Sequence, residues 1–138
     1  MKTVMCFGTF DILHLGHIHY FQQAKKHGDY LIVVIARDKT KQKQKKSTIF
    51  SERERVSLIK HLRLVDEVVL GYPDNHFRII KEKKPDVICL GYDHLITERH
   101  LSQALAALDL HPVIKRLKPY KPKTQKSTKL KKIILRRR

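Results

Sequence analysis

Acidic side chains, cysteine and tryptophan are scarce in this sequence. Its 138 residues include 13 aspartates and glutamates against 30 lysines and arginines, two cysteines and no tryptophan. No apolar run approaches the ~20 residues that a transmembrane helix needs, so we expect no membrane partner. Cys6 and Cys89 stand in separate apolar runs, which predicts buried thiols in a reducing compartment rather than a disulfide framework. Lys2 leads directly into an apolar run without a signal-peptide pattern, and we therefore expect a cytoplasmic protein.

The rest of the composition is typical of a folded globular chain, with 41% hydrophobic and 31% charged residues. This length most simply forms one domain over residues 1–138, with a basic loop, helix and tail at residues 119–138. The formal net charge of +17 indicates nucleotides, phosphorylated substrates or nucleic acid as partners, or else a lysine-rich solvated surface. Aromatic residues make up only 7%, and no stacking platform accompanies the basic residues, so nucleic acid is the least favoured partner.

Apolar runs and helical patterns alternate along the chain. The run DYLIVVIA at residues 29–36 is typical of a parallel strand that is covered on both faces. Ser51 fits a helix N-cap, with Glu54 at the capping-box spacing. The predicted strands are residues 3–7, 29–36, 65–71, 87–90 and 111–114, and a predicted helix follows each of the first four. The alternation predicts an α/β fold with a doubly wound parallel sheet.

Residues 8–17, with the sequence GTFDILHLGH, connect the first predicted strand to the first predicted helix. A helix N-terminus offers free N–H groups and a partial positive charge, so it favours phosphate. His14 and His17, three residues apart, would add donors on the same face. Gly8 and Gly16 would let a nucleotide approach the backbone closely. Two alternatives stay open: histidines that are solvated or cap the helix, and a His-x-x-His metal site, although zinc needs three or four ligands.

These ten residues closely resemble the Gly-x-Phe-Asp-x-x-His-x-Gly-His signature of the cytidylyltransferase-like nucleotidyltransferases. The resemblance implies a Rossmann-like fold and an enzyme that transfers a nucleoside monophosphate from CTP or ATP to a phosphate-bearing acceptor, with release of pyrophosphate. It places both histidines on the triphosphate, whose phosphates Mg²⁺ or another divalent cation would bridge. The nucleotide-binding positions that it implies are Gly8, Thr9, Phe10, His14, Leu15, Gly16 and His17.

Residues 39–47 are polar, rich in lysine and without an apolar anchor, so we expect a mobile loop beside the site. Its lysines would either close over phosphates through charge-assisted hydrogen bonds or form a solvated charge run. The segment KQKK at residues 43–46 resembles the lysine segment of glycerol-3-phosphate cytidylyltransferases. That resemblance implies catalytic contacts from Lys43 to the acceptor and from Lys45, or its neighbour Lys46, to the triphosphate.

Two further charged side chains receive supporting roles. Asp11, inside the motif, is expected to hold the motif turn by hydrogen bonding rather than to take part in chemistry. Family members carry an arginine at the position of Arg55, which implies an acceptor-binding or structural contact. An exposed helical arginine is the alternative.

A carboxylate follows the predicted strand at residues 87–90, in the sequence Gly91-Tyr92-Asp93. Ligands gather at the carboxyl ends of parallel strands, so Asp93 would hold a ribose hydroxyl, a base amine or hydrated magnesium, unless it caps the next helix. The same three residues resemble archaeal-type FAD synthases, which implies that Gly91 and Asp93 bind the adenine nucleotide. Glycerol-3-phosphate cytidylyltransferases carry Gly-Asp-Asp-Trp there. No complete set of protein ligands for a metal is expected.

The carboxyl-terminal stretch contains twelve basic residues from Lys115 onward and no acidic one. Ser127 and Thr128 fit the N-cap of a last helix, which would offer a second phosphate site opposite the histidines. This start resembles the family's Ser-Thr helix start, which implies contacts to the β- and γ-phosphates. Tyr120 resembles the tyrosine with which archaeal-type FAD synthases contact ATP, although this chain lacks the cysteine that many of them carry in the loop.

Three functional hypotheses remain. The first is an FMN adenylyltransferase, or FAD synthase, that uses ATP; residues 91–93 and Tyr120 favour it. The second is a CTP-dependent cytidylyltransferase that makes CDP-glycerol or a related CDP-alcohol, which residues 43–46 favour. The third is a non-catalytic, basic nucleic-acid-binding protein, which only the net charge favours. The resemblance also implies a homodimer.

Overall fold

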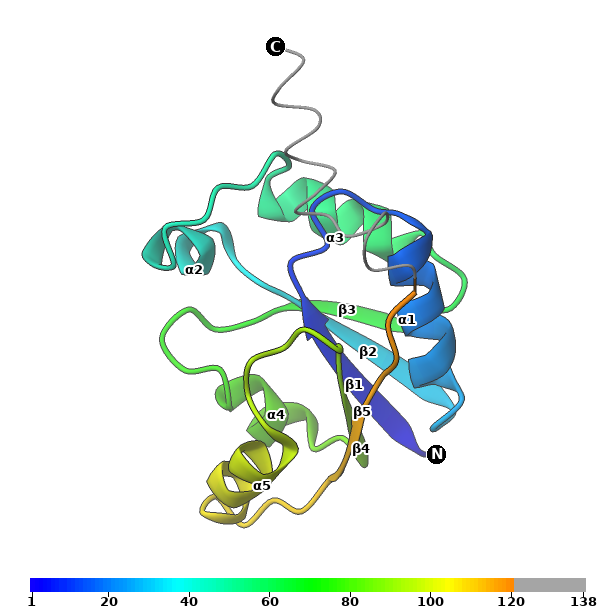
Figure 1. The fold of residues 1–138 in the computed structure, drawn as a ribbon, viewed down its shortest axis with the longest axis vertical. Helices are drawn as coiled ribbons and strands as arrows, with labels where there is room; N and C mark the ends of the chain where they lie inside the picture. The colour runs from blue at the N-terminus through cyan, green and yellow to red at the C-terminus, as the bar shows by residue number, and fades with distance from the viewer. Residues whose placement is uncertain (121–138) are drawn as a thin grey trace.

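A parallel sheet forms the centre of the computed structural model, which describes residues 1–120 (Figure 1). Its strands are β1 (Thr3–Gly8), β2 (Tyr30–Ile35), β3 (Glu67–Leu70), β4 (Val87–Leu90) and β5 (Val113–Arg116). Within the described residues they pair in the order β3-β2-β1-β4-β5, and each pairing is parallel. The predicted doubly wound α/β fold is confirmed, and the direction of winding reverses between β1 and β4.

Helices cover both faces of this sheet (Figure 1). They are α1 (Leu15–Lys25), α2 (Asp38–Lys43), α3 (Glu52–Lys60), α4 (Arg78–Lys83) and α5 (Glu98–Ala106). On one face, Phe21 of α1 and Ile59 of α3 join the first core cluster. On the other, Ile79 of α4 and Leu101 of α5 join the second. Among residues 1–120, none of these helices combines the length and apolarity needed to cross a bilayer.

The composition of β2 follows from its place inside this sandwich. Its residues from Leu31 to Ile35 are all buried. Successive side chains alternate between the two faces, so Leu31 and Val33 pack toward α1 and α3, whereas Ile32 and Val34 pack toward α4 and α5. A central parallel strand therefore needs apolar residues at consecutive positions, which is the pattern that the sequence shows.

Cys6 and Cys89 lie directly opposite each other on β1 and β4, and both are buried free thiols, as predicted. Burial raises the pKa of the Cys6 thiol far above its ordinary value and that of Cys89 to about 12. Both side chains therefore act as small uncharged core residues.

The segment predicted as a mobile loop at residues 39–47 is partly helical, which corrects that prediction. Thr40 of α2 is buried, and the helix start is tied to α3 by two reciprocal bonds. The backbone N–H of Asp38 donates to Oε1 of Glu52 at 3.0 Å, and the N–H of Glu52 donates to Oδ2 of Asp38 at 3.1 Å. This anchor is polar, and the apolar periodicity of the sequence therefore does not reveal it. The last predicted helix, with Ser127 and Thr128, lies outside the described residues.

Gly28 supports a testable prediction about packing. A Cβ at this position would stand 2.6 Å from Cγ2 of Val4 and 2.7 Å from the carbonyl oxygen of Lys2, a backbone group at the start of β1. We expect Gly28→Ala to lower the free energy of unfolding by about 1–3 kcal/mol in urea denaturation, because β1 would have to shift. Gly71→Ala is the matched control, since its Cβ would meet Cγ1 of Val34 at an ordinary 3.4 Å. Equal losses of stability in the two variants would contradict this explanation.

Candidate active site

A cavity of about 640 Å³ opens at the carboxyl ends of β1 and β4, where the strand order reverses. Among residues 1–120, four segments line it: the motif and the first part of α1, the residues around the end of α2, the loop after β4, and residues 118–120 after β5. Its volume lies within the range of ligand pockets, roughly 300–1,000 Å³. Open α/β sheets bind ligands at this crevice, so the fold itself marks the cavity as the candidate site.

His14 and His17 cap the N-terminus of α1 and each other. Nδ1 of His14 accepts the backbone N–H of Gly16 at 3.0 Å, and Nδ1 of His17 accepts the N–H of His14 at 3.3 Å. The two ring centroids are 4.0 Å apart. A neutral imidazole that accepts at Nδ1 carries its proton on Nε2, so both rings present an Nε2–H donor. Nε2 of His14 is buried without a hydrogen-bond partner among the described residues, which fits a donor that awaits a ligand.

Both imidazoles are held in the neutral form. Burial lowers the pKa of His14, while burial and then the neighbouring His14 lower the pKa of His17 to about 3. An anionic phosphate in the cavity would favour the protonated rings and raise both pKa values. The motif therefore provides donors before binding without placing two buried positive charges side by side.

Phe10 has a structural role that the sequence did not reveal. Its backbone is in the left-handed region at φ 52°, and its ring is 5% exposed. The ring packs edge-to-face against His17 at 5.3 Å between centroids. A Cβ on Gly8 would stand only 2.5 Å from Cζ of Phe10. Gly8 is therefore required by the Phe10 ring, which in turn supports His17.

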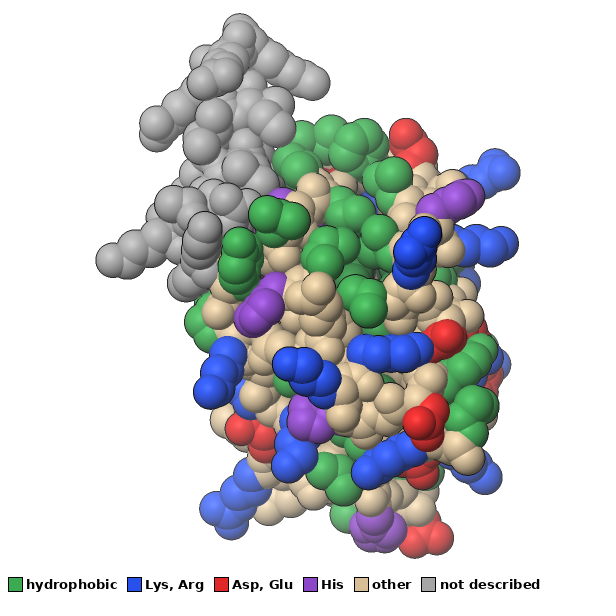
Figure 2. All heavy atoms as spheres, turned by 90° about the vertical axis from the view of Figure 1, so that its right-hand side faces the viewer, with side chains coloured by type: hydrophobic (Ala, Val, Ile, Leu, Met, Phe, Trp, Pro, Cys, Tyr) green, Lys and Arg blue, Asp and Glu red, His purple; other side chains and the backbone are tan. Residues whose placement is uncertain are grey.

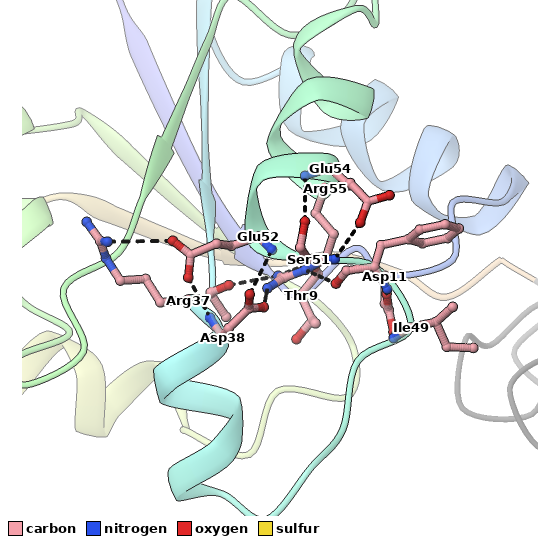
Figure 3. A network of polar contacts seen from close by, with 11 residues as sticks. Thr9, Asp11, Arg37, Asp38, Ile49, Ser51, Glu52, Glu54 and Arg55 are labelled. Carbon is pink, nitrogen blue, oxygen red and sulfur yellow. Dashed lines mark hydrogen bonds and ion pairs between the residues drawn. The ribbon is translucent and has the colours of Figure 1, made fainter.

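Asp11 joins the motif to the segment before α3 (Figure 3). Its carboxylate is 1% exposed and accepts the backbone N–H groups of Ile49 at 2.7 Å and Phe50 at 2.8 Å. Asp11 thus holds the motif turn by hydrogen bonding, as the sequence analysis expected.

Arg55 is fully buried at the centre of the same network (Figure 3). Its guanidinium donates to the carbonyl oxygens of Thr9 at 2.9 Å, Ala36 at 2.7 Å and Phe50 at 3.2 Å. It also forms an ion pair of 2.7 Å with Asp38. Arg55 does not line the cavity. The structural contact expected for Arg55 is confirmed and the exposed alternative is wrong, because this buried side chain joins three loops. Its position gives no support to a contact with the acceptor.

Of the three predicted lysines, only Lys46 lines the cavity, and Lys41 joins it there without having been predicted. Lys41 and Lys46 line it together with Ser47, whereas Lys43 and Lys45 do not. Lys45 adopts the left-handed conformation at φ 56°, and the N–H of Lys46 donates to the carbonyl of Lys41 at 2.9 Å. This turn ends α2 and brings Lys46 back beside Lys41. The prediction of a loop over residues 39–47 did not include this turn, and Lys41 was therefore not predicted.

Leu15 is the one motif position predicted to bind the nucleotide that stands outside the cavity lining. It begins α1, is 61% exposed and does not line the cavity. Gly16 and Thr9, in contrast, do line it. The exposure of Leu15 and its place outside the cavity lining give no support to a nucleotide contact from its side chain.

The loop after β4 brings Gly91, Tyr92, Asp93 and His94 to the cavity. Sequence reasoning missed His94, whose Nδ1 accepts the backbone N–H of Gly91 at 3.1 Å. Burial lowers its pKa, and Arg116 adds to this against the opposing effect of Asp93. Within residues 1–120 no three His, Cys, Asp or Glu side chains gather where they could hold a metal ion.

Two tyrosines complete the walls of the cavity. Tyr120 lines it as predicted and lies against the ring of His19, at 5.2 Å between centroids. Tyr20, which the sequence analysis did not single out, donates its hydroxyl to the carbonyl oxygens of Cys89 at 3.1 Å and Phe7 at 3.4 Å. Ser127 and Thr128 lie outside the described residues.

The lowered pKa of His17 predicts how stability depends on pH. The unfolded chain binds a proton on this residue near its ordinary pKa of 6.5, and the folded protein only near 3. Lowering the pH from 6.5 toward 3 should therefore destabilise the ligand-free protein. His17→Gln keeps a capping side chain but does not titrate, so its unfolding midpoint should fall less steeply than that of the wild type. Parallel pH profiles for the two proteins would show that His17 is not held neutral.

Comparison with known proteins places this geometry in a family. The family model described as cytidylyltransferase-like matches residues 5–133. The FAD synthase of Picrophilus torridus is 39% identical over 132 residues, which cover 96% of this chain and 95% of that protein. The FAD synthase of Thermoplasma volcanium is 42% identical over 135 residues, covering 98% and 95% respectively.

Solved structures agree on the fold. A protein of Thermoplasma volcanium GSS1 described as a lipopolysaccharide core biosynthesis protein superposes with a TM-score of 0.85 at 44% identity, over 87% of this chain and 98% of that one. Pantoate-beta-alanine ligase of Francisella tularensis gives a TM-score of 0.66 at 17% identity, over 95% of this chain and 65% of that one, which shows a shared fold alone. Because the family model matches residues 5–133 and the FAD synthases are 39% and 42% identical over nearly the whole chain, this chain belongs to the cytidylyltransferase-like family.

Proposed function

We propose that this protein is an FMN adenylyltransferase, an FAD synthase that forms FAD and pyrophosphate from ATP and FMN. The observation that carries this proposal is the identity of 38–42% to FAD synthases of almost the same length, over nearly the whole chain. The cavity at the switch point, with its neutral imidazole donors, supports nucleotide binding at the expected edge of the sheet.

The reaction needs little chemistry from side chains. A phosphate oxygen of FMN attacks the α-phosphorus of ATP, a new P–O bond forms, and the bond to the bridging oxygen of pyrophosphate breaks in line. The attacking phosphate is already an anion, so no strong base is required. Catalysis then consists of positioning the two phosphates and neutralising the charge that develops on the leaving group.

The residues of the cavity suit these two tasks. Nε2–H of His14 and of His17 would donate to the triphosphate, with His17 toward the leaving oxygens. Lys41 and Lys46, which line the cavity, would supply positive charge to the phosphates. Asp93 would contact the nucleoside. Ser127 and Thr128 would contact the β- and γ-phosphates, as the resemblance to the family implies.

A divalent cation such as Mg²⁺ fits this arrangement as a partner of the nucleotide. Among residues 1–120 no cluster of three ligating side chains is available, so phosphate oxygens and water would provide most of its ligands, with the carboxylate of Asp93 as the candidate from the protein. The cation would supply charge neutralisation on the triphosphate. We also propose that the protein is cytoplasmic and that it forms a homodimer. Light scattering can test the homodimer.

The other two hypotheses have weaker support. A CTP-dependent enzyme was favoured by residues 43–46, but Lys43 and Lys45 do not line the cavity. A nucleic-acid-binding role was favoured by the net charge. Figure 2 shows that, on the face carrying α1, lysine and arginine side chains of the described residues are interspersed with acidic and histidine side chains rather than gathered in one stripe.

The substrate pair can be identified by one assay. Pyrophosphate release should be fast with ATP and FMN. Its kcat/KM should be at least about tenfold lower when CTP replaces ATP or when glycerol 3-phosphate replaces FMN, because a site built to hydrogen-bond one substrate has polar groups that another substrate leaves unpaired. Turnover with CTP and glycerol 3-phosphate alone would reject the proposed function in favour of a cytidylyltransferase.

The role of His17 can be tested in the same assay. We expect His17→Ala to lower kcat by about 10²–10³-fold with an unchanged circular dichroism spectrum, because a donor to the leaving oxygens is lost. His100→Ala, which removes an exposed imidazole on α5, is the control and should retain wild-type turnover. Wild-type turnover in His17→Ala would remove His17 from the mechanism.

A further inference from the structure

The loop at residues 91–97 forms one wall of the cavity without regular secondary structure. It leaves the buried end of β4 and leads into α5, whose N-cap is Thr97. Its internal hydrogen bonds are few: the N–H of His94 donates to the carbonyl of Gly91 at 3.2 Å, and the N–H of Gly91 donates to the His94 ring. Its conformation therefore depends on contacts from outside the loop.

Arg116 supplies those contacts from β5. It pairs in register with Leu90, the last residue of β4, so its side chain starts beside the point where the loop begins. One guanidinium nitrogen donates to the carbonyl oxygens of Gly91 and His94, each at 2.8 Å, and the other donates to that of Ile96 at 2.6 Å. Three carbonyl groups of one loop thus converge on a single side chain.

Glu98 fixes the orientation of this guanidinium. It lies in the first turn of α5, and its Oε1 accepts from Nε of Arg116 at 3.0 Å within an ion pair. The planar fork of an arginine allows donation to the carboxylate and to the carbonyls at once, which a lysine cannot reproduce. Arg116 therefore links β5, the loop and the start of α5.

The same loop carries side chains that line the cavity. A Cβ on Gly91 would stand 3.3 Å from Oδ1 of Asp93 and 3.5 Å from Nε2 of His94. Both polar groups thus fold closely over Gly91, at the end of β4. Arg116 itself does not line the cavity. Where Asp93 and His94 lie is consequently decided by the backbone that Arg116 holds.

We propose that Arg116 is a positioning residue for nucleotide recognition, which acts by holding the carbonyl groups of residues 91–97 so that Asp93 and His94 meet the adenosine part of ATP. The identity of the nucleotide rests on the proposed function, while the action of Arg116 on the loop rests on its own contacts. The proposal places the nucleotide, and not FMN, against this wall, so it expects the KM for FMN to be independent of Arg116.

The test compares Arg116→Met and Arg116→Lys with a matched control, Arg78→Met, which removes an exposed arginine paired with Glu82 on α4. Steady-state pyrophosphate release gives kcat and the KM values for ATP and FMN, and calorimetry gives the Kd of ATP without FMN. We expect Arg116→Met to raise the KM and Kd for ATP by about 10–100-fold while the KM for FMN changes little. Arg116→Lys should recover part of the loss, and Arg78→Met should behave as the wild type.

A purely structural role would give a different result, namely lower thermal stability with unchanged KM and Kd for ATP in the folded fraction, and that outcome overturns the proposal. If Arg116→Met fails to fold, Arg116→Lys and Glu98→Gln decide the question. Each should raise the Kd of ATP, because Arg116→Lys removes donors to the loop carbonyls and Glu98→Gln removes the negative charge that orients the guanidinium. A wild-type protein that binds ATP but makes no FAD rejects the proposed function and leaves the Kd comparison as the test of Arg116. A wild-type protein that binds no ATP rejects both.

Discussion

Arginine side chains at the carboxyl edge of the sheet donate hydrogen bonds to backbone carbonyl groups of the loops that surround the cavity. An unpaired buried carbonyl costs about 1–3 kcal/mol. Arg55 satisfies three carbonyls on the β2 side of the motif, and Arg116 satisfies three on the β4 side. Between them, the Tyr20 hydroxyl donates to carbonyls of β1 and β4. The same physical solution thus builds the walls and the floor of the site.

The buried guanidinium of Arg55 also determines where the lysines lie. A charge inside a protein requires a partner, and Asp38 at the start of α2 provides it. Because Asp38 exchanges hydrogen bonds with Glu52, the N-terminus of α2 is joined to the N-terminus of α3. Asp11 adds a second connection, from the motif to the backbone before α3. Lys41 and Lys46 therefore reach the cavity from a fixed framework rather than from a loop that closes freely.

The two imidazoles of the motif are neutral for an electrostatic reason. Two protonated histidines 4.0 Å apart would repel each other and would require desolvation. Two neutral histidines that accept backbone N–H groups at Nδ1 avoid this cost and still present donors at Nε2. Positive charge is left to Lys41 and Lys46, which also line the cavity. The site thus combines neutral imidazole donors with lysine side chains on a separate segment.

The sequence by itself determined the alternation of strands and helices, the connection of the first strand to the first helix through the histidine motif, and the role of Asp11. These are local features: a strand is recognised by its consecutive apolar residues, a helix start by its capping residues, and a motif by its spacing. Only the tertiary structure decided that Arg55 is buried, that Lys41 rather than Lys43 reaches the cavity, and that Arg116 holds the loop after β4. Each of these depends on contacts across 17 to 46 positions of the chain or on a left-handed turn at a lysine. Charged residues that serve the core and charged residues that serve the ligand have the same local signature, because the partner that distinguishes them is brought close only by the pairing of the strands.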